Sequence, residues 1–83
     1  MAYHVNPWYP EAAKNERVQG SVILEAVISP SGCIRSVKVI LSRDPRLDLV
    51  SLITVAKWRY TPTLLDGVPV PVIMTITVNF RLS

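Results

Sequence analysis

A strict alternation of side chains begins at Val72 and continues to the end of the chain. Successive residues of a β-strand point to opposite faces of a sheet, so this alternation predicts a long amphipathic strand. One face holds Val72, Met74, Ile76, Val78, Phe80 and Leu82. The other face holds Ile73, Thr75, Thr77, Asn79 and Arg81.

Two earlier segments are also predicted to be strands. Residues 21–29 alternate with apolar positions on both faces, which is typical of a central strand, and residues 29–32 have the Ser-Pro-Ser-Gly composition of a turn. Residues 34–41 form the return strand. Their apolar positions are irregularly spaced, which indicates a β-bulge, and Arg35 and Lys38 would guard an exposed edge.

Helix-start signals precede two other segments. Pro10 suits the first position of a short helix over residues 10–17, with Glu11 in its first turn. Asp44 and Pro45 are a cap residue and a first-turn proline, so a second helix should continue to about Trp58.

The second helix would carry two apolar stripes. Leu52, Val55 and Trp58 share one face at helical spacing. The other stripe is Leu49, Ile53 and Ala56. Either this second stripe widens the buried face, or it is an exposed patch for self-association or a partner.

The remaining segments are expected to be irregular. Asp66-Gly67 is a strong turn signal flanked by prolines, so residues 60–70 should form a loop or a short irregular hairpin. Residues 1–8 have no apolar period and are expected to be extended or flexible.

Connection rules turn these elements into a fold. The first two strands form a hairpin, and a right-handed crossover through the second helix places the last strand beside the first. We expect a single α+β domain over residues 1–83: a small three-stranded antiparallel sheet of order 2-1-3, with both helices on one face. The long C-terminal strand then lies at an edge.

Composition narrows the class of protein. No apolar run is long enough to span a membrane, and the start of the chain is no signal peptide, so we expect a soluble domain without membrane contact of its own. The basic residues are scattered and the net charge is only +3, which disfavours a nucleic-acid partner. Cys33 has no partner for an internal disulfide and is either half-buried or an exposed thiol. With His4 as the only histidine, we expect no enzyme, no cofactor and no metal site.

An ordered set of short motifs resembles the C-terminal domain of TonB-type energy transducers. Residues 57–62, Lys-Trp-Arg-Tyr-Thr-Pro, are interpreted as a helix exit in which Trp58 packs inward, Arg59 points outward and Pro62 prevents continuation. The set, which spans residues 6–82, comprises Tyr9-Pro10, Val18-Gln19-Gly20, Trp58-Arg59-Tyr60 with Pro62, and Asn79-Phe80.

This resemblance implies a fold of the TonB/TolA C-terminal type and a mechanical function. Such domains bind the TonB-box peptide of outer-membrane receptors by adding it as a strand to the last strand. They transmit force from a proton-driven motor in the inner membrane, through a periplasmic protein anchored there, for uptake of nutrients such as siderophores. The implied partner-binding residues are Asn6, Pro7, Tyr9, Pro10, Val72, Ile73, Met74, Thr75, Ile76, Thr77, Val78, Asn79 and Phe80. The structural signature is Gly20, Trp58, Arg59, Tyr60 and Pro62.

Two other classes remain open. The same free edge could pair with a second copy of the chain and form a homodimer, assisted by the stripe at Leu49, Ile53 and Ala56. A small RNA-binding αβ module is the less favoured alternative, because Phe80 is the only aromatic residue in the strands and such modules stack bases on several.

Overall fold

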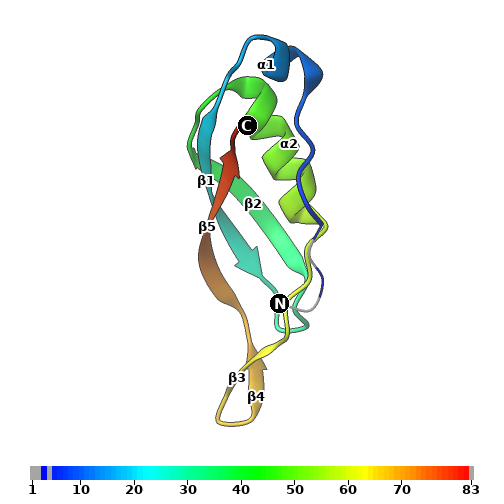
Figure 1. The fold of residues 1–83 in the computed structure, drawn as a ribbon. Helices are drawn as coiled ribbons and strands as arrows, with labels where there is room; N and C mark the ends of the chain where they lie inside the picture. Colours follow the sequence, from blue (N-terminus) through cyan, green and yellow to red (C-terminus); the bar gives the residue numbers. More distant parts are fainter. Residues whose placement is uncertain (1–2, 4, 83) are drawn as a thin grey trace.

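The fold is a three-stranded sheet with helices on one face and a protruding hairpin (Figure 1). The structure, a computed structural model, describes residues 3 and 5–82, so His4 lies outside the described residues. The elements in chain order are α1 (Glu11–Asn15), β1 (Gly20–Ile28), β2 (Ile34–Leu41), α2 (Pro45–Ala56), β3 (Thr63–Leu65), β4 (Val68–Val70) and β5 (Val72–Phe80).

The main sheet has the order β2-β1-β5, and both of its pairings are antiparallel. The predicted order 2-1-3 is confirmed, with β5 as the third strand of the sheet. The β1–β5 pairing is unbroken from Gly20 opposite Phe80 to Ile28 opposite Val72. The β1–β2 pairing has two register shifts, which leave Arg35 and Ile40 without a direct partner, so the bulge expected in this strand is also confirmed.

The core lies between the sheet and the helices. Alternate residues of β1 are buried, as are those of the second half of β5, because every second side chain points to the helical face. α1 adds Ala13 to this same core, and α2 adds three aliphatic side chains. The core residues are Ala13, Val22, Leu24, Ala26, Leu47, Val50, Val55, Trp58, Ile76, Val78 and Phe80.

Both helices are shorter than expected. α1 begins at Glu11, because Pro10 has extended backbone angles (φ −59°, ψ 133°) and occupies the cap position rather than the first helical one. α2 starts as predicted: the Asp44 carboxylate accepts a 2.9 Å hydrogen bond from the Arg46 backbone N–H. It ends at Ala56, before Trp58. None of the helices in the described part of the chain has the length and apolar character of a membrane span.

The Trp-Arg-Tyr run follows α2 in an extended form, so the expectation that the helix continues to about Trp58 was wrong, although Trp58 does pack inward and Arg59 does point outward. Arg59 exchanges two backbone hydrogen bonds with Tyr3, at 3.0 and 2.8 Å, and the Tyr60 N–H donates to the Gly32 carbonyl at 2.8 Å. Trp58 is buried and Arg59 exposed because successive side chains of an extended chain alternate. Through these backbone hydrogen bonds, residues 59 and 60 connect the N-terminal segment to the turn between β1 and β2.

A hairpin of β3 and β4 precedes β5. Asp66 (φ 51°) and Gly67 (φ 80°) both have positive φ, which is the two-residue turn geometry that Asp-Gly favours. The hairpin extends beyond the main sheet (Figure 1), and Asp66 and Gly67 form the turn between its two strands. Its residues are largely exposed, including Leu64, Leu65 and Val68.

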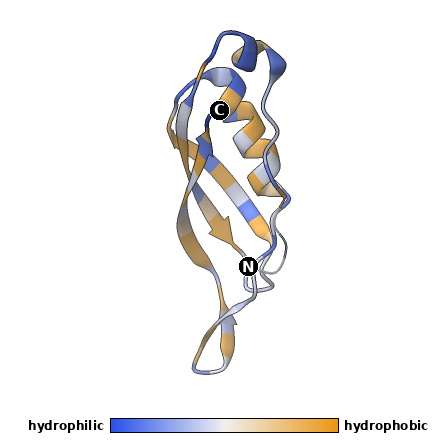
Figure 2. Cartoon of the chain, in the orientation of Figure 1, coloured by the Kyte–Doolittle hydropathy of each residue, from blue (hydrophilic) through white to orange (hydrophobic). Residues whose placement is uncertain are grey.

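The second stripe of α2 is not part of the core. Leu49 is 58% exposed and Ile53 is 38% exposed, and Ala56 is also exposed. The alternative of a wider buried face is therefore wrong, because α2 turns Leu47, Val50 and Val55 toward the sheet instead. Apolar colouring extends along much of α2 in Figure 2.

Candidate functional site

β5 has a strand neighbour on one side only. It pairs with β1 along its length, and no strand lies on its other side in the part of the chain that the structure describes (Figure 1). The predicted edge position of the last strand is confirmed.

The pairing pattern identifies the backbone groups on this edge. The Ser29 N–H donates to the Cys33 carbonyl at 2.8 Å, so Ser29 directs its N–H toward β2. Neighbouring residues of a strand direct their N–H and C=O to opposite sides, so Ile28 directs its groups toward β5 and bonds Val72. Along the unbroken β1–β5 register, the even-numbered residues of β5 bond β1. The outward backbone groups belong to Ile73, Thr75, Thr77 and Asn79.

Side chains of β5 anchor one face and leave the other open. Ile76, Val78 and Phe80 are 6%, 5% and 3% exposed and belong to the core. Thr75 and Thr77 are exposed on the face away from the helices. The strand is therefore held from within while its outer backbone stays accessible.

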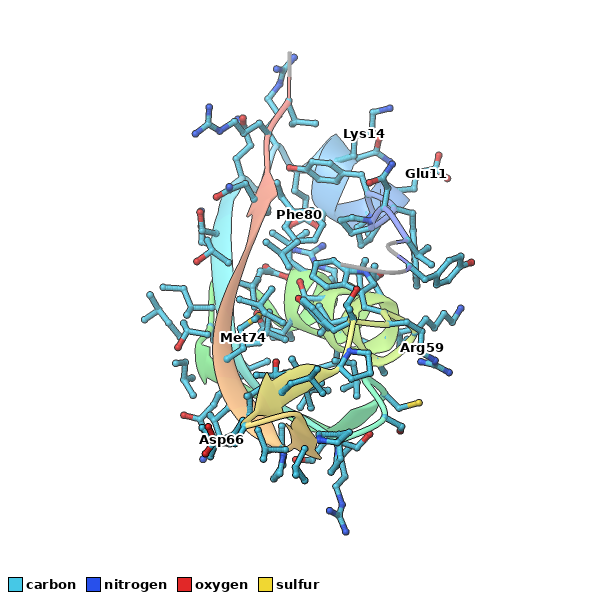
Figure 3. All side chains as sticks on the ribbon, turned by 90° about the horizontal axis from the view of Figure 1, so that it is seen from below. Glu11, Lys14, Arg59, Asp66, Met74 and Phe80 are labelled. Atoms are coloured by element: carbon cyan, nitrogen blue, oxygen red, sulfur yellow. The ribbon has the colours of Figure 1, made fainter. Side chains whose placement is uncertain are left out.

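The N-terminal segment lies beside the C-terminal half of β5. The Tyr9 ring meets the Phe80 ring edge-to-face, with 5.5 Å between centroids, and the Tyr9 hydroxyl donates to the Val18 carbonyl. The Trp58 indole N–H donates to the Val5 carbonyl at 2.8 Å. Figure 3 shows Phe80 on the side of β5 that faces α1. Tyr9 thus has a packing role on the core, which does not depend on a partner.

A shallow cavity of about 250 Å³ lies between the N-terminal segment and the C-terminal half of β5. Its lining consists of Pro7, Trp58, Thr77, Val78 and Asn79. The structure therefore brings together residues that the sequence assigned to two separate stretches of the partner site.

Other predicted site residues lie apart from this cavity. Val72, Ile73 and Met74 are at the hairpin end of β5, about six to eight residues from Phe80, which is roughly 20 to 26 Å at strand spacing. Asn6 is exposed, and Pro10 is half-buried before α1. Among the signature residues, Gly20 has the Arg43 side chain directly against it, 2.6 Å from the position that a Cβ atom would take.

An ion-pair network that sequence reasoning missed joins the helix ends. The Arg46 guanidinium contacts Asp44 at 3.0 Å and Glu16 at 2.8 Å. Hydrogen bonds from Arg46 lower the pKa of Asp44 to about 2, and the hydrogen bond from Arg46 also lowers the pKa of Glu16. Separately, burial raises the pKa of the Tyr60 phenol. No sequence signal linked Glu16 to Arg46, since 30 residues separate them.

Comparisons with known proteins agree with this geometry. Residues 5–82 match the family described as the C-terminal domain of the Gram-negative bacterial TonB protein. The chain is 32% identical to Protein TonB of Vibrio cholerae serotype O1 over 84 residues, which cover all of this chain and 34% of that protein. The chain thus spans about a third of that relative's length.

A solved structure has the same fold. The solution structure of the Pseudomonas aeruginosa TonB C-terminal domain superposes with a TM-score of 0.75 at 26% identity, covering 94% of this chain and 80% of that one. The matched sequence, the strand order and the edge position of β5 lead to one conclusion: the chain belongs to the TonB C-terminal domain family.

Proposed function

We propose that this domain binds the TonB-box peptide of an outer-membrane receptor by strand addition to β5. The observation that carries the proposal is the outward backbone edge at Ile73, Thr75, Thr77 and Asn79. An exposed strand edge offers main-chain hydrogen bonds to any extended peptide, while adjacent pockets provide specificity.

Hydrogen-bond energies support a moderate affinity. Roughly six hydrogen bonds with a net gain of about 1 kcal/mol each would contribute about 6 kcal/mol. A micromolar Kd corresponds to about 8 kcal/mol, and association also has an entropic cost. Side-chain contacts must therefore contribute as well. The N-terminal segment beside β5 supplies them, because Pro7 lies next to Thr77, Val78 and Asn79.

Membership of the TonB family supports the rest of the proposal. In it, the domain works in the periplasm as part of a longer protein anchored in the inner membrane. A proton-driven motor moves that protein. The peptide bound to β5 transmits the resulting force to the receptor, which then lets a nutrient pass. The domain acts as an interaction module in this scheme, without chemistry of its own.

Calorimetry with a synthetic TonB-box peptide tests the strand addition. Thr75→Pro removes an outward N–H and puts the proline ring where the added strand would lie, so it should abolish measurable binding, whereas Thr75→Ala keeps the N–H and should bind within about threefold of wild type. Binding by Thr75→Pro with unchanged affinity would exclude strand addition to β5.

Self-association is the alternative that has its own observation. The exposed stripe of Leu49, Ile53 and Ala56 lies on α2, and a homodimer could use this stripe or the β5 edge. Light scattering over a range of concentrations distinguishes a dimer from a monomer. An RNA-binding role has less support, because Phe80 is only 3% exposed and offers no surface on which a base could stack.

A further inference from the structure

The cavity beside β5 is placed to contact one side chain of an added strand. Its walls are Pro7 and Trp58 on one side and residues 77–79 of β5 on the other, and its volume is about 250 Å³. We propose that this cavity selects an apolar side chain at the peptide residue directly opposite Val78. This inference rests on the proposed strand addition and adds a specificity rule to it.

The position opposite Val78 follows from the pleat. Val78 directs its own N–H and C=O to Val22 of β1, and its side chain points to the helical face. Thr77 and Asn79, on either side, direct their backbone groups outward. Directly paired residues of neighbouring strands point their side chains to the same face, whether the strands are parallel or antiparallel. The residue paired with Val78 therefore points into the cavity in either direction of binding.

The walls determine the chemistry of this position. The Trp58 indole N–H already donates to the Val5 carbonyl, and proline has no N–H, so both residues present hydrocarbon to the cavity. None of the five lining residues is charged, so a charged side chain would lose water there without gaining an ion-pair partner, whereas a branched aliphatic one would bury apolar surface. Valine, isoleucine and leucine fit this description.

Neighbouring peptide positions meet a different environment. Residues opposite Thr77 and Asn79 would direct their side chains to the open face of the sheet, where both of these residues are exposed. The structure thus predicts one selective position between two tolerant ones.

A capped nine-residue threonine peptide with one central guest residue is the probe. Because the guest residue is the only one that differs, it is the residue expected to lie opposite Val78. Binding is measured by calorimetry and by changes in the NMR chemical shifts of the Thr77 and Asn79 amides. Valine or leucine guests should bind at least about tenfold more tightly than aspartate or lysine guests, with alanine between them.

A domain variant tests the same contact from the other side. Pro7→Ala removes part of the wall, so it should weaken the valine peptide by about threefold or more and the alanine peptide much less. Pro69→Ala, at an exposed hairpin position, is the matched control and should change neither.

The outcomes separate the two claims. Equal affinities for all guests, with binding still abolished by Thr75→Pro, overturn the cavity rule and leave strand addition standing. No binding by any guest and none by the TonB-box peptide overturns both. A guest preference that Pro7→Ala leaves unchanged also overturns the cavity rule, because the preference then arises elsewhere.

Discussion

The carbonyl oxygen of Tyr60 occupies the space that a side chain on Gly32 would need. An ideal Cβ atom at position 32 would lie 1.9 Å from this oxygen, and Gly32 has a φ of +93°. The Gly32 carbonyl also accepts the Tyr60 N–H. The close approach of these two backbones holds the extended run after α2 against the β1–β2 turn.

Gly32→Ala should therefore destabilise the domain by about 2–4 kcal/mol, from unfavourable φ together with a clash against fixed backbone. Urea unfolding followed by circular dichroism measures the change. Gly67→Ala is the control, because Gly67 also has positive φ but nothing lies within 4 Å of its Cβ position. It should cost only about 1–2 kcal/mol, and equal costs would contradict the predicted clash.

Trp58→Phe tests the attachment of the N-terminal segment. It keeps an aromatic ring in the core but loses the indole N–H that donates to Val5, so unfolding should be easier by about 1 kcal/mol. Hydrogen exchange of the Tyr3 and Arg59 amides should become faster. Trp8→Phe is the matched control, since Trp8 is 50% exposed, and it should stay within about 0.5 kcal/mol of wild type.

Proline substitutions test the assignment of inward and outward backbone groups on β5. Thr75→Pro removes an outward N–H and should cost about 1 kcal/mol, whereas Met74→Pro removes a ladder bond to Ala26 and should cost about 3 kcal/mol or more. Thermal unfolding of both variants provides the comparison. The reverse order of stability would mean that Met74, rather than Thr75, directs its groups outward.

Acid should weaken the junction between α1 and α2. The folded-state pKa of Asp44 is lowered from 3.8 to about 2, so its contribution to stability is complete above about pH 4 and is lost as the pH falls toward 2. Asp44→Asn retains an oxygen for the Arg46 N–H but no charge. The free energy of unfolding of this variant should therefore fall less than that of the wild type between about pH 4 and pH 2. The free energy of unfolding between pH 6 and pH 2 shows whether the two profiles differ in this window.

Charged residues should be tolerated on the outer face of α2. Leu49→Lys should change the free energy of unfolding by less than about 1 kcal/mol, because Leu49 is 58% exposed. Leu47→Ala, at a fully buried position two residues earlier, should cost about 2–5 kcal/mol. A large loss of stability for Leu49→Lys in urea titrations would show that the stripe is covered in solution.

Patterns of local origin were readable from the sequence. The alternation in β1 and β5, the Asp44-Pro45 helix start and the Asp-Gly turn each depend on near neighbours, and all three are confirmed. The edge position of β5 followed from connection rules. The partner-binding roles of individual residues remain predictions.

Features that depend on distant contacts were not readable. The helix exit at Trp58 was placed two residues too late, because backbone bonds from Arg59 to Tyr3 draw the chain into an extended form. Helical spacing alone could not show which stripe of α2 faces the sheet. The cavity at Pro7 likewise arises only when residues 7 and 58 and β5 meet.

The β1–β5 ladder has a mechanical consequence. Its hydrogen bonds run perpendicular to the strands, and the register continues without interruption from Gly20 to Ile28. A guest strand pulled lengthwise along β5 would therefore load this ladder in shear, with all its bonds sharing the tension at once. A force perpendicular to the strands would break the same bonds one after another. The domain should therefore resist a force along the strand axis far better than a force across it.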